Sequence, residues 1–284
     1  MNHREHAGVL IQALPYIQKL YGKIVVVKYG GNAMISEELR ETVINDIILM
    51  KCIGIEPIVV HGGGPDISNF INWIGEKSEF INGLRYTDEN TMDIVLMVLG
   101  GKVNKDLVKL IEKSGGKALG ICGLDGSLLK AKKLVTEVDL GYVGEITSVN
   151  TDILKMAMSS GYIPVVGSIA IGEDDNHVYN INADTCASKI ASALRAEKLI
   201  LLTDVSGVML DPSDKDSLLS ILRLHEIPKL FHDKVIKGGM IPKIDCCVES
   251  VRMGVKRAHI IDGRIPHSII LEVLSNEGIG TMIY

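Results

Sequence analysis

The sequence of 284 residues is poor in aromatic side chains and has no surplus of basic charge. Phe, Trp and Tyr make up 4% of the residues, and 30 Lys and Arg stand against 35 Asp and Glu, for a formal net charge of −5. Proteins that bind nucleic acid through its phosphates usually carry a basic excess. The negative balance therefore argues against a general nucleic-acid-binding protein.

Disulfide and membrane signals are also missing. The five cysteines are an odd number and form no C-x-x-C motif, which favours reduced thiols in the cytoplasm over a disulfide framework. No apolar run approaches the roughly 18 residues of a membrane span, and the first residues lack the pattern of a signal peptide. We therefore expect a cytoplasmic globular protein, long enough to form two hydrophobic cores.

The common nucleotide-binding signatures do not occur either. The sequence contains no G-x-x-x-x-G-K-[ST] motif and no complete G-x-G-x-x-G motif. Their absence argues against P-loop NTPases and dinucleotide-dependent dehydrogenases. It leaves open a nucleotide that is held in another way.

What the sequence does contain is an alternation of strand and helix patterns. Short β-branched or apolar runs, typical of buried parallel strands, occur at 24–29, 57–61, 117–121, 163–167, 198–203 and 257–261. Helices are expected at 36–53, 66–74, 88–113, 150–160, 183–195, 227–235, 241–253 and 268–274, hairpins at 126–147, and a short strand at 178–181. This order predicts a three-layer α/β fold with a mainly parallel sheet.

Two of the expected strands end in glycine loops, at residues 30–31 and 62–64. Glycine lets the backbone approach a ligand and present its N–H groups. At the carboxyl ends of parallel strands, beside a helix N-terminus, such loops bind anions. Each loop alone could be a tight turn, but two of them, with Lys28 on the first strand, predict a phosphate site.

Further polar residues stand near expected helix starts and strand ends. Lys243 falls in the first turn of a helix, where its charge would add to the positive helix end; an exposed surface lysine is the alternative. Asn182 suits a helix N-cap, whereas capping does not readily explain Asn180 and Asp184. The segment 203–207 follows a buried strand and would either hold a nucleotide or form a simple turn.

Eight segments together resemble the amino acid kinase family, and within it most closely the N-acetyl-L-glutamate kinases. They are KYGGNAM (28–34), VHGGGPDIS (60–68), NGLRYTD (82–88), GLDGSLL (123–129), NINADTCAS (180–188), TDVSGV (203–208), GGMIPKI (238–244) and HIIDGRIPHSIILE (259–272). The resemblance covers nearly the whole chain from Lys23 onward. It implies a three-layer αβα sandwich around an eight-stranded, mainly parallel sheet, as in carbamate kinases. The implied reaction is ATP + N-acetyl-L-glutamate → ADP + N-acetyl-L-glutamyl 5-phosphate, the second step of the acetylated route to arginine.

The resemblance also implies roles for individual residues. Lys28 and Lys243 would flank the transferring phosphoryl group, the N–H groups of Gly31 and Gly64 would hold its oxygens, and Asp184 would orient the two lysines. The acceptor carboxylate is already ionised at pH 7, so no general base is needed. Catalysis would then come from positioning and charge neutralisation.

Binding residues follow from the same resemblance. Arg85 would take the α-carboxylate of the substrate through its planar fork, and Asn180 would hold the acetylamino-acid backbone, alongside Gly63 and Gly64. The implied ATP contacts are Lys28, Gly30, Gly31, Thr203, Asp204, Gly207 and Lys243. Mg²⁺ would be carried by the ATP phosphates and not by protein ligands.

The resemblance divides the chain into residues 1–22 as an oligomerisation helix, 23–196 as the substrate-binding and dimer-forming half, and 197–284 as the ATP-binding half. Residues 1–22 carry apolar side chains on two helical faces, so we expect them to be buried against the body or a partner. Pro15 should kink or break this helix.

Arginine-inhibited members of the family have such a helix, and it interlaces three dimers into a hexamer. The resemblance therefore implies feedback inhibition by L-arginine, with Tyr21, His259, Glu272 and Gly278 as contacts.

Two other functions are alternatives. A kinase for N-acetyl-2-aminoadipate would use a substrate one methylene longer, a difference worth only about 1–3 kcal/mol of discrimination. A catalytically silent arginine sensor would have no need for Lys28, Arg85, Asp184 and Lys243, so their presence argues against it.

Overall fold

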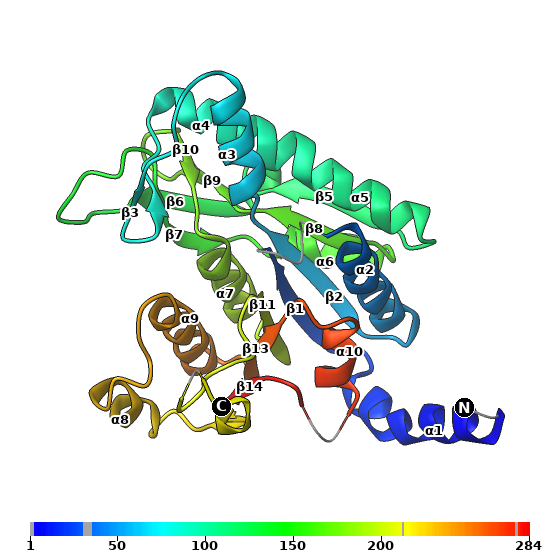
Figure 1. The fold of residues 1–284 in the computed structure, drawn as a ribbon. Coiled ribbons are helices and arrows are strands. Elements are labelled where there is room, and N and C mark those ends of the chain that lie inside the picture. The colour runs from blue at the N-terminus through cyan, green and yellow to red at the C-terminus, as the bar shows by residue number, and fades with distance from the viewer. Residues whose placement is uncertain (1–2, 31–35, 212, 276–277) are drawn as a thin grey trace.

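The computed structural model describes residues 3–30, 36–211, 213–275 and 278–284. Its centre is an eight-stranded sheet (Figure 1). In spatial order the strands are β12 (Ile221–Leu222), β14 (Thr281–Ile283), β13 (Arg257–Asp262), β11 (Lys198–Thr203), β1 (Ile24–Tyr29), β2 (Glu56–His61), β8 (Ile163–Gly167) and β5 (Ala118–Cys122). Neighbouring strands are parallel except for β13 and β14. The predicted mainly parallel α/β fold is confirmed.

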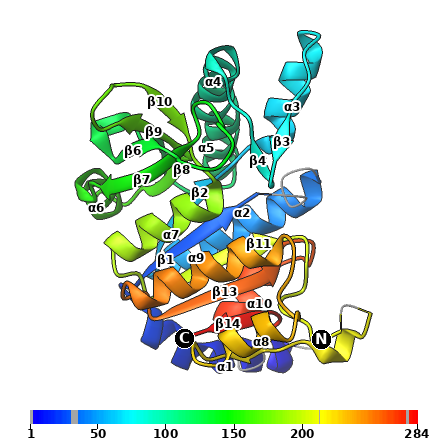
Figure 2. The same ribbon diagram turned by 90° about the vertical axis from the view of Figure 1, so that its left-hand side faces the viewer.

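Helices cover both faces of this sheet (Figure 2). One face packs against α6 (Asp152–Ser159), α7 (Ala183–Ala193), α8 (Ile227–His232) and α9 (Met240–Arg252). The other packs against α2 (Glu37–Cys52), α3 (Gly64–Trp73), α4 (Glu89–Leu96), α5 (Asn104–Lys113) and α10 (Ser268–Val273). Because side chains alternate along a strand, Val26 of β1 enters the first layer and its neighbours Val25 and Val27 enter the second.

The two expected cores are therefore the two faces of one sheet. Each contains residues from before and after position 197: Val26 and Leu201 in one, Val25 and Ile200 in the other. The chain is not built as one core for each half, and the central strands β1 and β11, which pair in parallel, join the halves directly.

Smaller sheets lie at one end of the molecule. The hairpins expected at 126–147 belong to a four-stranded sheet whose order is β10 (Val178–Asn180), β9 (Ile169–Gly172), β6 (Leu129–Lys133) and β7 (Gly144–Val149). β3 (Phe80–Ile81) and β4 (Leu84–Arg85) form a two-stranded hairpin. Short 3₁₀ turns occur at Asp125–Ser127 and Lys215–Ser217.

The single helix predicted over 88–113 is wrong in its middle part. A π-helix, Met97–Val103, separates α4 from α5. Its wider turns set Leu99 and Val103 against Gly63, where an added Cβ would lie 2.6 Å from Leu99 Cδ2. Apolar periodicity at 3.6 residues does not reveal such an insertion, which is frequent at functional sites. The helix predicted to reach 235 also ends early, because Lys234 adopts a positive φ of 56°.

The N-terminal helix α1 (His3–Leu20) runs through Pro15 without interruption. Of the predicted kink or break at this proline, the break is therefore wrong. Pro15 is exposed, and water can satisfy the carbonyl that loses its helical partner. Leu20 is buried in the second layer, whereas Ile11 and Leu14 remain exposed. Figure 1 shows α1 extending from the lower edge of the body. In the described part of the chain, no helix combines the length and apolar character that a membrane crossing requires.

Candidate functional site

Three charged side chains meet above the carboxyl end of β1. Lys28 lies on β1, Asp184 in the first turn of α7 and Lys243 in the first turn of α9. Lys28 Nζ is 3.0 Å from Asp184 Oδ1, and Lys243 Nζ donates to Asp184 Oδ2 at 2.7 Å. The structure thus brings together three residues that lie up to 215 positions apart (243 − 28).

The electrostatics of this charged triad favour an anion. Burial raises the pKa of Asp184, but the charges of Lys28 and Lys243 outweigh it and hold the pKa below its usual range. The predicted N-cap is confirmed, since Asn182 Oδ1 accepts from the N–H groups of Asp184 and Thr185. Two ammonium groups against one carboxylate leave a net charge of +1 for an incoming ligand.

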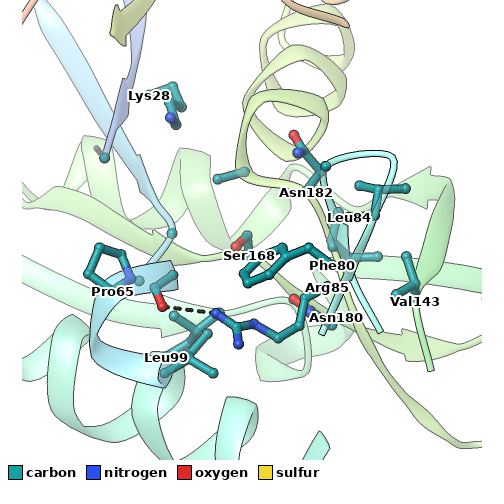
Figure 3. A pocket seen from close by; sticks show the side chains of 18 residues that line it. Lys28, Pro65, Phe80, Leu84, Arg85, Leu99, Val143, Ser168, Asn180 and Asn182 are labelled. Carbon is teal, nitrogen blue, oxygen red and sulfur yellow. Dashed lines mark hydrogen bonds between the residues drawn. The ribbon is translucent and has the colours of Figure 1, made fainter. Parts of the chain in front are cut away.

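A first cavity of about 260 Å³ opens beside the triad (Figure 3). Lys28 stands at one end of it and Arg85 at the other, with the loop 62–64 and the start of α7 between them. Its apolar wall includes Leu84, Leu99 and Val143. The cavity thus combines cationic ends with an apolar middle.

The glycines of the two loops are required for different structural reasons. Gly63 is required by packing against Leu99 and Val103. An added Cβ at Gly64 would meet no atom within 4 Å, so the space before it is open to a ligand. Gly64 begins α3, where the first N–H groups lack helical partners. At Gly30 an added Cβ would lie 3.0 Å from Lys28 Nζ, so glycine makes room for the ammonium. Gly31 lies outside the described residues.

Arg85 is buried at the far end of the cavity, where desolvation lowers its pKa. Nη1 donates to Ser78 Oγ at 2.5 Å, and Nη2 donates to Ser68 Oγ at 2.8 Å and to the Gly64 carbonyl at 2.9 Å. A guanidinium can hold a carboxylate with two parallel N–H groups in two ways, through Nε and Nη2 or through Nη1 and Nη2, and both ways use Nη2. A bidentate carboxylate would therefore replace Ser68 or the Gly64 carbonyl as the partner.

Asn180 ends β10 on the same cavity. Its Nδ2 donates to Thr87 Oγ1 at 3.2 Å, and its backbone N–H donates to the Tyr142 carbonyl at 2.8 Å. Among the described residues nothing donates to its Oδ1. The Asn180 side chain therefore presents Oδ1 as a hydrogen-bond acceptor for a ligand.

Sequence reasoning missed the buried pair that supports the 62–64 loop. His61 Nδ1 donates to the Gly62 carbonyl at 2.9 Å, and its Nε2 accepts from Asn104 Nδ2 at 3.1 Å. Asn104, the first residue after the π-helix, also donates to the carbonyl of Val165 on β8. Burial lowers the pKa of His61 to about 4, so the ring is neutral at pH 7. The dipeptide His-Gly at a strand end gives only a weak signal of this arrangement.

His61 predicts a pH dependence of stability. In the unfolded chain His61 takes up a proton near pH 6.5, whereas the folded chain resists it until about pH 4. The contribution of His61 to the free energy of unfolding is therefore fully present above pH 6.5. It falls by about 3 kcal/mol as the pH drops from 6.5 to about 4. We expect His61→Gln to flatten the profile of unfolding free energy between pH 4 and 6.5, measured by urea titration. Parallel profiles for variant and parent would contradict this.

A second cavity, of about 450 Å³, adjoins the triad on the other side. Lys28 lines both cavities, and Lys243, Thr203, Asp204 and Gly207 line the second. The Thr203 hydroxyl donates to the Val205 carbonyl at 2.9 Å and accepts from the Val205 N–H. At Gly207, with φ of 145°, an added Cβ would lie 2.5 Å from Thr281 Oγ1. Thr203 and Gly207 thus shape the wall of this cavity.

A third cavity lies far from the triad, where α1 meets β13 and α10. Of the four residues expected to contact L-arginine, His259, Glu272 and Gly278 line this cavity and Tyr21 does not. Tyr21 is 70% exposed, and its ring covers Gly54. Tyr16, five residues earlier, lines the cavity instead. The apolar stripes of α1 do not tell which tyrosine faces inward.

Charges in the third cavity form a chain. Lys198 Nζ donates to His259 Nε2 at 3.0 Å, and His259 Nδ1 donates to Glu272 Oε1 at 2.6 Å. Burial lowers the pKa of Lys198 to about 8 and also lowers that of His259. For Glu272, burial raises the pKa, but His259 and the N–H groups of Ile279 and Gly280 outweigh it. A carboxylate and a cation therefore stand on either side of a neutral imidazole.

Residues 23–262 of the chain match the amino acid kinase family. Over all 284 residues, and over the full length of both relatives, the chain is 75% identical to acetylglutamate kinase of Clostridium beijerinckii and 62% identical to that of Clostridium kluyveri.

Two solved structures share the fold. N-acetylglutamate synthase of Neisseria gonorrhoeae has a TM-score of 0.84 at 24% identity; the match covers 98% of this chain and 63% of the synthase chain. Carbamate kinase of Giardia lamblia has a TM-score of 0.64 at 17% identity, with 92% and 98% covered.

Proposed function

We propose that Lys28, Asp184 and Lys243 form the catalytic centre of this chain, which belongs to the amino acid kinase family and phosphorylates N-acetyl-L-glutamate in arginine biosynthesis. ATP is the phosphoryl donor of such a kinase, and the product is N-acetyl-L-glutamyl 5-phosphate. The relatives give no support to N-acetyl-2-aminoadipate or to a silent sensor.

The observation that carries this proposal is the position of Lys28 between two cavities. It lines both of them, and through Asp184 it is held beside Lys243, which lines the second. We assign the first cavity to acetylglutamate and the second to ATP. The phosphoryl group would then pass from one to the other beside the two ammonium groups.

The chemistry needs charge neutralisation rather than proton transfer. The acceptor carboxylate is already ionised, and the low pKa of Asp184 makes it an organiser of the lysines instead of a base. The two ammonium groups would stabilise negative charge on the transferring oxygens. We propose the N–H of Gly64 as a further donor, and Gly31 as its counterpart on the first loop.

The second cavity suits a nucleotide. Its wall is formed largely by apolar side chains such as Val208 and Met240, with Thr203 and Asp204 at the end of β11. We propose that this wall holds the adenosine, while Gly30, Lys28 and Lys243 face the phosphates. Mg²⁺ bound to those phosphates would add positive charge at the reaction centre.

Arg85→Lys is expected to raise the KM for acetylglutamate by about 10²-fold and the KM for ATP by less than about threefold. Lysine offers a point charge and cannot hold a carboxylate bidentately while also donating to Ser78 and to either Ser68 or the Gly64 carbonyl. ADP release, measured while each substrate is varied, gives both constants. Equal changes in the two KM values would remove Arg85 from the substrate cavity.

We propose the third cavity as the site of inhibition by L-arginine. An amino acid with a cationic side chain needs an acidic partner for its guanidinium and basic partners for its carboxylate. Glu272 supplies the first, and Lys198 and Arg257 supply the second. Support also comes from Gly278, where an added Cβ would lie 2.7 Å from Glu272 Oε2 and would crowd this carboxylate. Tyr16 takes the place expected for Tyr21.

We also propose an assembly for the chain: a dimer through residues 23–196, and a hexamer of three such dimers joined by residues 1–22. Large exposed apolar side chains support both contacts. Trp73 and Met97 are 79% and 55% exposed in the first region, and Ile11 is 67% exposed on α1. Residues 197–284 are proposed as the ATP-binding half. The five free cysteines are consistent with a cytoplasmic location.

A further inference from the structure

Ser168 is a buried residue of the first cavity to which the reaction as described gives no role. It lies between β8 and β9 and is 1% exposed. Figure 3 shows it in the middle of the cavity, between Phe80, Arg85 and the start of α7. Among the described residues no group donates to or accepts from its hydroxyl. Buried hydroxyl groups are normally hydrogen-bonded, so an unpaired one that faces a cavity points to a ligand.

The backbone fixes where this hydroxyl can reach. The Ser168 N–H donates to the His61 carbonyl at 3.3 Å, and the Ser168 carbonyl accepts from the Ile181 N–H at 3.1 Å. His61 leads into the 62–64 loop on the phosphoryl side, and Ile181 follows Asn180 on the other side. Ser168 is therefore held between the two ends of the cavity.

N-acetyl-L-glutamate has three polar parts, of which two are already placed. Its side-chain carboxylate goes to the lysine end and its α-carboxylate to Arg85. The acetamido group remains for the middle of the cavity, where Leu99, Val143 and Ile181 offer an apolar surface to its methyl group.

We propose that the Ser168 hydroxyl donates a hydrogen bond to the acetamido carbonyl oxygen of the substrate. Asn180 supports this direction: one N–H of its Nδ2 donates to Thr87 Oγ1, and its Oδ1 can accept from the acetamido N–H, which leaves the acetamido carbonyl to Ser168. One donor and one acceptor then match the two polar atoms of the amide. The inference rests on the proposed placement of acetylglutamate in this cavity.

This pairing makes Ser168 a determinant of specificity for acylated amino acids. Free glutamate has an ammonium group and no carbonyl at this position. Its binding would leave the hydroxyl unpaired and would set a charge against the apolar wall. The cavity would thus reject the unacetylated amino acid without a repulsive side chain.

The test is Ser168→Ala, assayed by ADP release. We expect the KM for acetylglutamate to rise roughly tenfold, the value of one hydrogen bond, with kcat and the KM for ATP changed less than about threefold. Ser188→Ala is the matched control: this serine is also fully buried but bonds Ser250 between α7 and α9, away from the cavity. An unchanged KM in Ser168→Ala, or an equal rise in Ser188→Ala, overturns the proposal.

A second substrate fixes the direction of the bond. In 2-acetoxyglutarate the amide N–H is replaced by an ester oxygen and the carbonyl is kept. The tenfold penalty of Ser168→Ala should persist with this ester; its disappearance would show that the hydroxyl accepts from the N–H and would overturn the donation. Arg85→Lys in the same assay distinguishes a failure of the proposed substrate placement from a failure of the Ser168 inference alone. If neither variant changes the KM for acetylglutamate, the substrate placement fails; if only Arg85→Lys does, the Ser168 inference alone fails.

Discussion

Alanine at Lys28 or at Lys243 is expected to lower kcat by about 10²–10³-fold while the chain remains folded. In the proposed catalytic centre, each ammonium is a preorganised positive charge where the transferring phosphoryl group builds up negative charge. The loss of one such donor costs this much in enzymes that rely on electrostatic stabilisation. Lys28→Ala should also raise both KM values, because Lys28 borders both cavities. Lys243→Ala should affect the KM for ATP more.

The measurement is steady-state ADP release at saturating substrates, with thermal unfolding as a check of the fold. Lys189→Ala is the matched control, because Lys189 and Glu249 form a more exposed ion pair between the same helices that carry Asp184 and Lys243. Exposed pairs contribute little, so this variant should keep near-normal turnover. Near-normal turnover in Lys28→Ala or Lys243→Ala would refute the assigned catalytic centre.

Two truncations are expected to separate assembly from inhibition. Removal of residues 1–14 should turn the proposed hexamer into a dimer, because it deletes the exposed apolar part of α1 that includes Ile11 and Leu14. It keeps Tyr16, Lys19 and Leu20, which line the third cavity. Removal of residues 1–22 should in addition abolish inhibition by L-arginine and lower stability, since Leu20 is a buried core residue.

Sedimentation velocity reports the assembly, and ADP release against increasing L-arginine reports the inhibition. Ile11→Glu should dissociate the hexamer as the shorter truncation does, since a charge in an apolar contact is costly. Gln12→Ala, a change at an exposed polar position of the same helix, should leave it intact. A hexamer that survives the loss of residues 1–22, or a full-length chain insensitive to L-arginine, would contradict the proposed regulation.

The fold could be predicted from the sequence because its signals are local and repeated. The buried strands β1, β2, β8 and β11 are short apolar runs, and the helix expected at 36–53 begins at Ser36, whose hydroxyl caps α2. The π-helix could not be predicted, because the buried apolar residues keep a spacing of four across it, as a continuous helical face would: Val95, Leu99, Val103, Leu107 and Ile111. In the fold, its residues Leu99 and Val103 pack against Gly63, a tertiary contact that the local sequence does not indicate.

Site residues could be predicted where a chemically suitable residue also stands at the end of a buried strand. Lys28 and the glycines stand at strand ends, where anion sites form in parallel sheets. Lys243 became a candidate mainly through family resemblance, because a lysine near a helix start is usually a surface residue. Ser168 was not predicted, although it directly follows the buried strand β8, just as the two glycine loops directly follow β1 and β2. A lone serine carries too little signal until its surroundings show that it has no partner.

The shared carboxylate between Lys28 and Lys243 also constrains how such an enzyme can change over generations. If Asp184 were lost first, two ammonium groups would face each other in a site where the three side chains are 11–23% exposed, with nothing to compensate them. Loss of either lysine first leaves a balanced pair. A lineage that gave up phosphoryl transfer would therefore be expected to discard a lysine before the aspartate, and a descendant with Asp184 and one lysine would mark the first step of that path.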